Sequence, residues 1–369
     1  MHRPPLDLTR LRVFPLAERK SLTRAEDILV TPEAPFQPLS EDLAATVAEA
    51  ASRIQAARSR GASVILMYGA HLLRNGAAPL VTALMEGGWI THLATNGAGT
   101  IHDWEYAWLG RSTENVEENV ATGTFGTWDE TGRNIHLALM AGALERLGYG
   151  RALGRFIAED GCQVPSEEQL ETAVSQFPGD PLAVAAAELL VALRRFDLTE
   201  GPQVVTHAWK SASILAQAWR LGVPVTVHPG IGYDIISCHP MFNGGVIGRA
   251  AGEDFRWFAG AVEGLDDGVV LSVGSAIMAP QIFEKSLSCV HNLRFQDDRP
   301  AVSGHSIYVV DLQDGGDWDW TQGEPPKTNP AYYLRFCKSF SRMGGRMRYL
   351  QCDNLAFIQH LLHQLQSGE

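Results

Sequence analysis

The sequence lacks the features that mark several classes of protein. Its 369 residues include only five cysteines, an odd number, and no two of them form a CxxC pair. This argues against a disulfide framework and a structural zinc site, and it favours a reducing cytoplasm as the location. No apolar run approaches the roughly 20 residues of a membrane helix. The N-terminus has no apolar signal-peptide core, so we expect no membrane association.

Positive charge is scarce as well. The formal net charge is −12 and the pI is about 5.5. Surfaces that bind nucleic acid are basic, so we expect no nucleic-acid partner. An acidic surface would attract a cationic substrate such as a polyamine or a basic amino acid, although acidic residues also serve solubility alone. No HExxH or paired His/Cys spacing occurs, and we therefore expect no metal.

What the sequence has is an alternation of short apolar runs with helical segments, almost from end to end. This alternation predicts an α/β fold, a doubly wound and mostly parallel sheet with helices on both faces. Residues 1–40 contain six prolines. They are expected to form an arm on the body or on a neighbouring subunit, ahead of a single domain over residues 41–369. Residues 111–134 are polar and glycine-rich and predict a long loop.

Four small-residue turns each follow a short apolar run. Parallel sheets bind ligands at the carboxyl ends of their strands, and a helix that follows such a turn offers its positive end to phosphate. None of the turns is a GxGxxG fingerprint. They nevertheless predict a nucleotide cofactor, held at Tyr68, Gly69, Asn96, Gly97, Gly99, Gly274 and Ser275. The remaining turn runs from Pro229 to Gly232.

Polar side chains stand beside two of these turns. His102, Asp103 and Glu105 follow the second, where they could bind a ribose, an amine or a metal. The alternative is that Asp103 caps a helix and Glu105 is solvated. Asp234 and His239 flank the third turn, where Asp234 would hold a cationic amine and His239 would move a proton. Their alternative is a loop aspartate and a buried, hydrogen-bonded histidine.

Near the C-terminus, Lys338 lies in the run AYYLRFCKSF. A lysine among aromatic side chains can have a lowered pKa and form an imine, and the alternative is an exposed helix lysine. Trp318 and Trp320 would stack on a ligand ring, close a lid or pack at an interface.

These stretches resemble the deoxyhypusine synthase family over roughly residues 60–365. The similar segments are Asn96 to Asp103, Val223 to Asp234 and Val273 to Ser275, and Lys338 falls at the position of the family's imine-forming lysine. Asp353 matches an acidic residue near the cofactor. The resemblance implies NAD, oxidation of a polyamine-type amine, and transfer of an aminoalkyl group through a lysine imine to an acceptor that can be a protein lysine. It also implies a homo-oligomer, either a dimer or a tetramer.

The chain departs from this pattern at several places. Ile101 and His102 replace the family's paired glutamates, and Pro280 and Gln281 stand where its catalytic histidine would be. The segment from Asn96 to Gly110 is also similar to the ornithine cyclodeaminase-type domain, which implies NAD-dependent amino-acid deamination. A third possibility is a non-catalytic NAD-binding protein.

Together these arguments assign three groups of residues. The expected catalytic residues are Lys338, Asp234 and His239. Asp103 and Asp353 join the turn residues at the cofactor. The expected substrate-binding residues are His102, Glu105, Asp314, Trp318 and Phe336.

Overall fold

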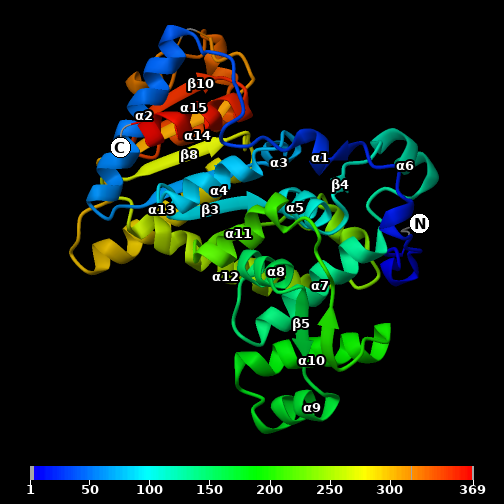
Figure 1. Cartoon of the computed structure of the whole chain (residues 1–369). Helices are drawn as coiled ribbons and strands as arrows, with labels where there is room; N and C mark the ends of the chain where they lie inside the picture. Colours follow the sequence, from blue (N-terminus) through cyan, green and yellow to red (C-terminus); the bar gives the residue numbers. More distant parts are fainter. Residues whose placement is uncertain (1–3, 317, 368–369) are drawn as a thin grey trace.

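The computed structural model, which describes residues 4–316 and 318–367, is built on a parallel sheet of six strands. The sheet has the order β10-β9-β8-β2-β3-β7 (Figure 1). The strands are β2 (Val64–Tyr68), β3 (His92–Asn96), β7 (Val225–His228), β8 (Val269–Val273), β9 (Ser306–Asp311) and β10 (Arg346–Gln351). The predicted parallel sheet is confirmed.

The strand order contains one reversal. From β2 the chain moves outward through β3 to β7, then returns to the other side of β2 and moves outward through β8, β9 and β10. If the six strands are numbered 1 to 6 in chain order, the sheet reads 3-2-1-4-5-6 from β7 to β10, which is the order of doubly wound dinucleotide-binding folds. The reversal lies between β2 and β8. Ligands of such sheets bind in the crevice outside the carboxyl ends of the strands at this point.

Helices cover both faces of the sheet, as predicted. Alternate residues of a strand point to opposite faces. In β2, Val64, Leu66 and Tyr68 therefore enter one core while Ile65 and Met67 enter another. The first core includes α2 (Glu41–Ser59), α4 (Ala78–Glu86) and α15 (Asn354–Ser367); the second includes α12 (Gly244–Glu263), α13 (Met278–Gln296) and α14 (Arg335–Ser341).

A long helical insertion joins β3 to β7. It consists of α5 (Gly97–Leu109), β4 (Arg111–Ser112), α6 (Val116–Thr122), α7 (Asp129–Ala143), α8 (Tyr149–Ala158), β5 (Gly161–Val164), α9 (Glu167–Gln176), α10 (Pro181–Phe196), β6 (Gly201–Val204), η3 (Lys210–Ala212) and α11 (Ile214–Leu221). The part formed by α9, α10, β5 and β6 projects away from the sheet (Figure 1). The antiparallel pair β5–β6 lies outside the main sheet.

Two local predictions within this insertion are wrong. Residues 111–134 are not one long loop, because α6 and the beginning of α7 lie within them. Asn115 caps α6 by accepting a hydrogen bond from Glu118, and Gly123 ends it in the left-handed conformation. Both are recognised helix boundary signals. The second small-residue turn is already helical, because α5 begins at Gly97.

The N-terminal arm packs on the body of its own chain. It contains η1 (Leu8–Arg10), η2 (Leu16–Glu18), β1 (Thr23–Arg24) and α1 (Ala25–Ile28). Strand β1 pairs with β4, and the backbone N–H of Leu16 donates to the carboxylate of Glu130. The elements not yet given are α3 (Ala70–Arg74), η4 (Ile235–Cys238), η5 (Trp320–Gln322) and η6 (Pro330–Tyr333). Among the described residues, no helix is long and apolar enough to cross a membrane.

Candidate functional site

At the reversal of strand order, the turns after β2 and β8 approach each other closely. A Cβ on Gly69 would lie 2.1 Å from the carbonyl oxygen of Gly274. Gly274 itself has a φ of +60°, and a Cβ there would lie 2.3 Å from the side-chain nitrogen of Asn354. Gly69 and Gly274, two of the four glycines that the sequence assigned to the cofactor, therefore pack against each other at the switch point. The first residue of α15 joins them there.

Two buried polar atoms beside Gly274 have no protein partner. Within the described chain, neither Ser275 Oγ nor Asn354 Oδ1 makes a hydrogen bond, and each residue is only 7% exposed. Buried polar groups are nearly always hydrogen-bonded, so these atoms are suited to meet the hydroxyl or amide groups of a ligand. The neighbouring Asp353 is exposed, and it uses Oδ1 to accept from the N–H groups of Leu355 and Ala356. Tyr68, by contrast, is fully buried in the first core.

The beginning of α5 is occupied by the protein's own side chains. Asn96 Oδ1 accepts from the N–H of Gly99, and Asp234 accepts from the N–H groups of Gly230 and Ala98. A Cβ on Gly97 would lie 2.2 Å from Asp234 Oδ2, so a glycine is required there. Asn96 and Asp234 therefore occupy N–H groups that the sequence analysis assigned to a cofactor phosphate. Ala98 and Asp234 instead form part of the wall of the adjoining pocket.

A pocket of about 310 Å³ opens beside the first turns of α5. It brings together three of the predicted residues, His102, Glu105 and Asp234. Both signs of charge line it, together with apolar side chains. Its remaining lining residues are Arg19, Arg74, Ala98, Ile101, Thr113, Glu114, Val116, Phe125, Tyr233 and Ile235. We call this the substrate pocket, because the sequence analysis assigned two of its residues, His102 and Glu105, to a substrate.

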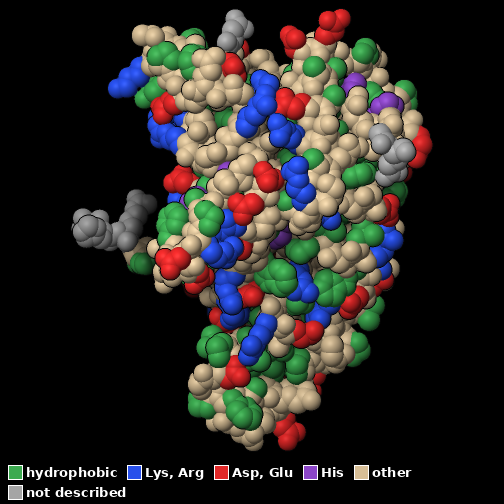
Figure 2. All heavy atoms as spheres, turned by 90° about the vertical axis from the view of Figure 1, so that its left-hand side faces the viewer, with side chains coloured by type: hydrophobic (Ala, Val, Ile, Leu, Met, Phe, Trp, Pro, Cys, Tyr) green, Lys and Arg blue, Asp and Glu red, His purple; other side chains and the backbone are tan. Residues whose placement is uncertain are grey.

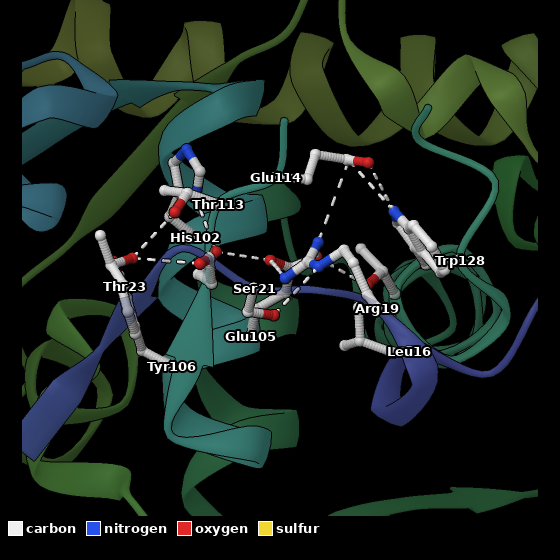
Figure 3. A network of polar contacts seen from close by, with 12 residues as sticks. Leu16, Arg19, Ser21, Thr23, His102, Glu105, Tyr106, Thr113, Glu114 and Trp128 are labelled. Carbon is white, nitrogen blue, oxygen red and sulfur yellow. Dashed lines mark hydrogen bonds and ion pairs between the residues drawn. The ribbon is translucent and has the colours of Figure 1, made fainter. Parts of the chain in front are cut away.

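A buried ion pair forms one wall of the substrate pocket (Figure 3). Arg19 Nη1 and Nη2 lie 2.8 and 2.7 Å from Glu105 Oε1 and Oε2, and both side chains are almost completely buried. Thr131 also donates to Glu105, while the Arg19 guanidinium lies 5.6 Å from the ring of Trp128. A bidentate pair of this kind is geometrically specific, so it fixes the arm against α5.

A second contact of Glu105 determines which nitrogen of His102 carries its proton. Ser112 Oγ donates to Glu105 Oε2 at 2.5 Å and lies 2.7 Å from His102 Nδ1. Since the single hydroxyl hydrogen is used on Glu105, Nδ1 must be the donor to the serine oxygen. Burial lowers the pKa of His102 to about 4, so the ring is neutral near pH 7. Nε2 then carries a lone pair.

The remaining charges of the pocket differ in their environments. Burial raises the pKa of Glu114, whose carboxylate accepts from Asn119 and Trp128, and it also raises the pKa of Asp234. Arg74 is exposed, and no carboxylate of the described chain lies within ion-pair distance of it. The pocket thus offers an unpaired guanidinium on one side and acidic groups on the other.

Two predicted residues have structural contacts away from this pocket. Asp103 is fully buried and accepts from Ser213 Oγ and from the N–H groups of Ile214 and Leu215, which caps α11. Burial raises its pKa to about 7. His239 is buried against α7, with Nδ1 accepting from the N–H of Met241. Neither lines the substrate pocket. Asp103 does cap a helix, as in the alternative interpretation, but it lies on α5 and the helix that it caps is α11.

The predicted residues near the C-terminus lie outside the substrate pocket as well. Lys338 Nζ is 3.2 Å from Glu324 Oε1 and 3.4 Å from the centre of the Tyr332 ring. Imine formation requires an amino group that can reach the substrate, whereas the contacts of Nζ here are with Glu324 and Tyr332. Phe336 and Trp318 belong to the second core, and the exposed Asp314 accepts from the N–H of Gly316.

Sequence reasoning missed four residues of the site: Arg19, Arg74, Glu114 and Asn354. Arg74 lies on the helix that directly follows the first glycine turn, and this position was the available signal. Asn354 likewise opens the helix after β10. Arg19 and Glu114 belong to an arm and to a segment read as a loop, and no local pattern distinguishes them.

No family model and no curated protein matches the sequence. Several solved structures, by contrast, are similar to this chain. Unliganded AgrE shares 13% identity over 90% of this chain and 34% of its own, with a TM-score of 0.44. ArgZ, an arginine dihydrolase of cyanobacteria, shares 14% over 87% of this chain and 32% of its own, with a TM-score of 0.39. The present chain thus spans about a third of the length of these two proteins.

A conserved putative LOR/SDH protein from Methanococcus maripaludis S2 is also similar in structure. It shares 14% identity over 96% of this chain and 74% of its own, with a TM-score of 0.42. AgrE has in addition been solved as a ternary complex with ornithine and NAD+, which shares 14% identity with this chain at a TM-score of 0.43. Likenesses this distant carry no argument about function, which must come from the site itself.

Proposed function

We propose that this protein is an NAD-dependent enzyme that oxidises the amine of a small amino acid held in the substrate pocket. One observation carries the proposal. A pocket with an unpaired arginine and acidic side chains lies beside a switch-point crevice that contains unpartnered buried polar atoms. A zwitterionic substrate needs both signs of charge, and a dinucleotide needs the crevice.

The crevice and the pocket are close enough to act together. Helix α3 begins after Gly69 in the crevice and ends at Arg74 in the pocket. At about 1.5 Å per residue, its five residues span roughly 7 Å. The strands that end beneath the two sites, β8, β2 and β3, are immediate neighbours, at a spacing of about 5 Å.

The pocket residues have distinct roles in this proposal. Arg74 would bind the substrate carboxylate, because it is the unpaired guanidinium of the pocket. Asp234 and Glu114 would hold the amino group. His102 Nε2 would accept a hydrogen bond from the amino group, since Nδ1–H is already committed to Ser112. Arg19 and Glu105 would position His102 through that serine.

The cofactor would lie in the crevice. Ser275, Asn354 and the exposed carboxylate of Asp353 would contact it, beside the turns after β2 and β8 that Gly69 and Gly274 allow to pack against each other. Bound there, NAD would accept the hydride from the carbon that bears the amine. The resulting substrate imine would add water and release ammonia.

The deoxyhypusine-synthase-like reaction has less support from the geometry. It needs Lys338 as a free amine near the substrate, whereas this lysine of α14 is paired with the loop residue Glu324 and does not line the substrate pocket. The sequence also departs from the pattern of the deoxyhypusine synthase family at Ile101, His102, Pro280 and Gln281. We therefore place amino-acid deamination ahead of aminoalkyl transfer.

An assay of two substrates distinguishes these reactions. The purified protein is incubated with NAD and either L-ornithine or spermidine, and ammonia and transferred aminoalkyl groups are measured. Ornithine is the first probe because of the resemblance to the ornithine cyclodeaminase-type domain, and other amino acids follow. The proposal predicts ammonia from an amino acid. Spermidine-dependent transfer without ammonia from any amino acid would overturn it.

A further inference from the structure

A second pocket lies at the opposite edge of the sheet, where the strands begin. Its volume is about 270 Å³, and α8, α11 and the segment that leads into β7 enclose it. Figure 2 looks onto this side of the molecule and shows Lys and Arg side chains next to apolar ones on its lower half. The pocket is lined by Gly150, Arg151, Leu215, Ala218, Trp219, Gly222, Val223, Pro224, Val225 and Trp257.

Arg151 lies close to two indole rings in this pocket. Its guanidinium carbon lies 5.7 Å from the ring centre of Trp219 and 5.0 Å from that of Trp257. Aromatic rings attract a guanidinium without accepting conventional hydrogen bonds from its N–H groups, so these donors remain available. No carboxylate of the described chain lies within ion-pair distance of Arg151, whereas Arg155, one turn later on α8, is paired with Glu145.

The backbone that carries Arg151 is fixed. The N–H of the preceding residue, Gly150, donates to the buried carboxylate of Asp254 at 2.9 Å, and the same oxygen accepts from Val227. A Cβ on Gly150 would lie 2.1 Å from the carbonyl oxygen of Val225, so α8 is seated directly on β7. The arginine is therefore held in place before any ligand arrives, which favours binding.

We propose that this pocket binds a small carboxylate with an aliphatic body. The N–H edge of Arg151 would take the carboxylate in a bidentate pair. The aliphatic part would lie against Leu215, Ala218 and Val223. A liquid water occupies about 30 Å³, so the pocket has the volume of about nine waters, the size of a small organic acid. The apolar side chains of the pocket disfavour a free phosphate ion, which has no apolar part to contact them. This site is separate from the substrate pocket and does not depend on its function.

Isothermal titration calorimetry with 4-methylpentanoate tests the proposal on the full-length protein without NAD or amino acid. Saturable binding is expected, while the neutral 4-methylpentanamide and inorganic phosphate bind at least tenfold more weakly. Arg151→Gln should weaken binding of the acid by about 10- to 100-fold, the usual range for a hydrogen bond to a charged group. Arg146→Gln, at an exposed arginine just before α8 that does not line the pocket, is the control and should leave binding unchanged.

Three results would overturn the proposal: no binding of the acid to the wild-type protein, equal binding of the amide, or equal losses in the two arginine variants. Equal binding of phosphate would show an anion site without the apolar component, which also contradicts it. The melting temperature of each variant is recorded, and Arg151→Lys provides a second test. A lysine keeps the charge but lacks the planar fork, so intermediate affinity is expected.

Discussion

Arg19 and Glu105 lie 86 residues apart in the sequence and form a buried, bidentate ion pair in one wall of the substrate pocket. Desolvating two charges is costly, so a buried pair is not in itself evidence of high stability. Its partners nevertheless depend on each other, because the loss of either one leaves an unpaired charge in the interior.

The first prediction concerns this dependence. Arg19→Met should lower the free energy of unfolding by about 3–5 kcal/mol, because it leaves the Glu105 carboxylate buried without its partner. The double variant Arg19→Met/Glu105→Gln should lose clearly less than the sum of the two single variants. Urea denaturation measures all three. Arg24→Gln is the control, since its pair with Glu26 is exposed and should contribute under about 1 kcal/mol. Strict additivity of the two changes would show that the pair is not coupled.

The second prediction concerns the crevice. Ser275→Ala and Asn354→Ala remove buried polar atoms that have no protein partner in the described chain. Neither should lower the melting temperature, but each should raise the Kd for NAD by about three- to tenfold, the value of one hydrogen bond. Tryptophan-fluorescence titration gives the Kd. A variant that melts earlier but binds NAD like the wild type would assign these atoms to the fold instead of a cofactor.

The third prediction concerns Arg74. If its guanidinium binds the substrate carboxylate, Arg74→Gln should raise KM for the amino acid by about 10- to 100-fold. The change in kcat should be smaller, because the residue binds a part of the substrate that does not react. Arg53→Gln serves as control, since Arg53 is exposed on α2 and does not line the pocket. If both variants keep the wild-type KM, the carboxylate is bound elsewhere.

The fourth prediction follows from the pKa of Asp103. Burial raises this pKa from 3.8 to about 7 in the folded protein. The folded state therefore binds the proton more tightly than the unfolded state, and the contribution of Asp103 to stability is lost as pH rises from about 4 to about 7. The loss amounts to at most about 4 kcal/mol at 1.36 kcal/mol per pKa unit.

Asp103→Asn should remove this pH dependence. As pH rises from about 4 to about 7, the unfolding free energy of the wild type should fall relative to that of Asp103→Asn. Urea denaturation at a series of pH values measures the difference, and His102, whose pKa is lowered, affects both proteins alike. A difference that stays constant with pH would mean that the carboxyl group is ionised throughout.

The fifth prediction separates the two reactions. Lys338→Met removes one of the two basic partners of Glu324, the other being Arg342, and does not alter the substrate pocket. Deamination should proceed with the wild-type kcat, because no imine with the enzyme is involved. Loss of turnover in a variant that still folds, as judged by circular dichroism, would restore the lysine to the mechanism.

Much of the fold could be predicted from the sequence, because its signals are local. The β-branched run of β8 and the cap at Ser40 identify their elements without knowledge of the rest of the chain. The sheet order needed the structure. Nothing in the sequence states that β8 returns beside β2, although that return brings Gly69 and Gly274 together at the switch point.

The site was predictable only in part for the same reason. His102, Glu105 and Asp234 follow strands directly, so their place at one edge of the sheet was foreseeable. Arg19 comes from the arm, and only the folded chain places it on Glu105. The ion pair of Lys338 could not be predicted either, because the sequence gives no sign that the loop residue Glu324 pairs with it.

The central claim is hydride transfer between an amino acid in the substrate pocket and NAD in the crevice. Its most direct test uses amino acids deuterated at the carbon that bears the amine, with mass spectrometry of the recovered cofactor. The account predicts deuterium in NADH from at least one amino acid, and its loss in Arg74→Gln at substrate concentrations below the raised KM. Unlabelled cofactor with every amino acid, together with label transferred from deuterated spermidine, would contradict it.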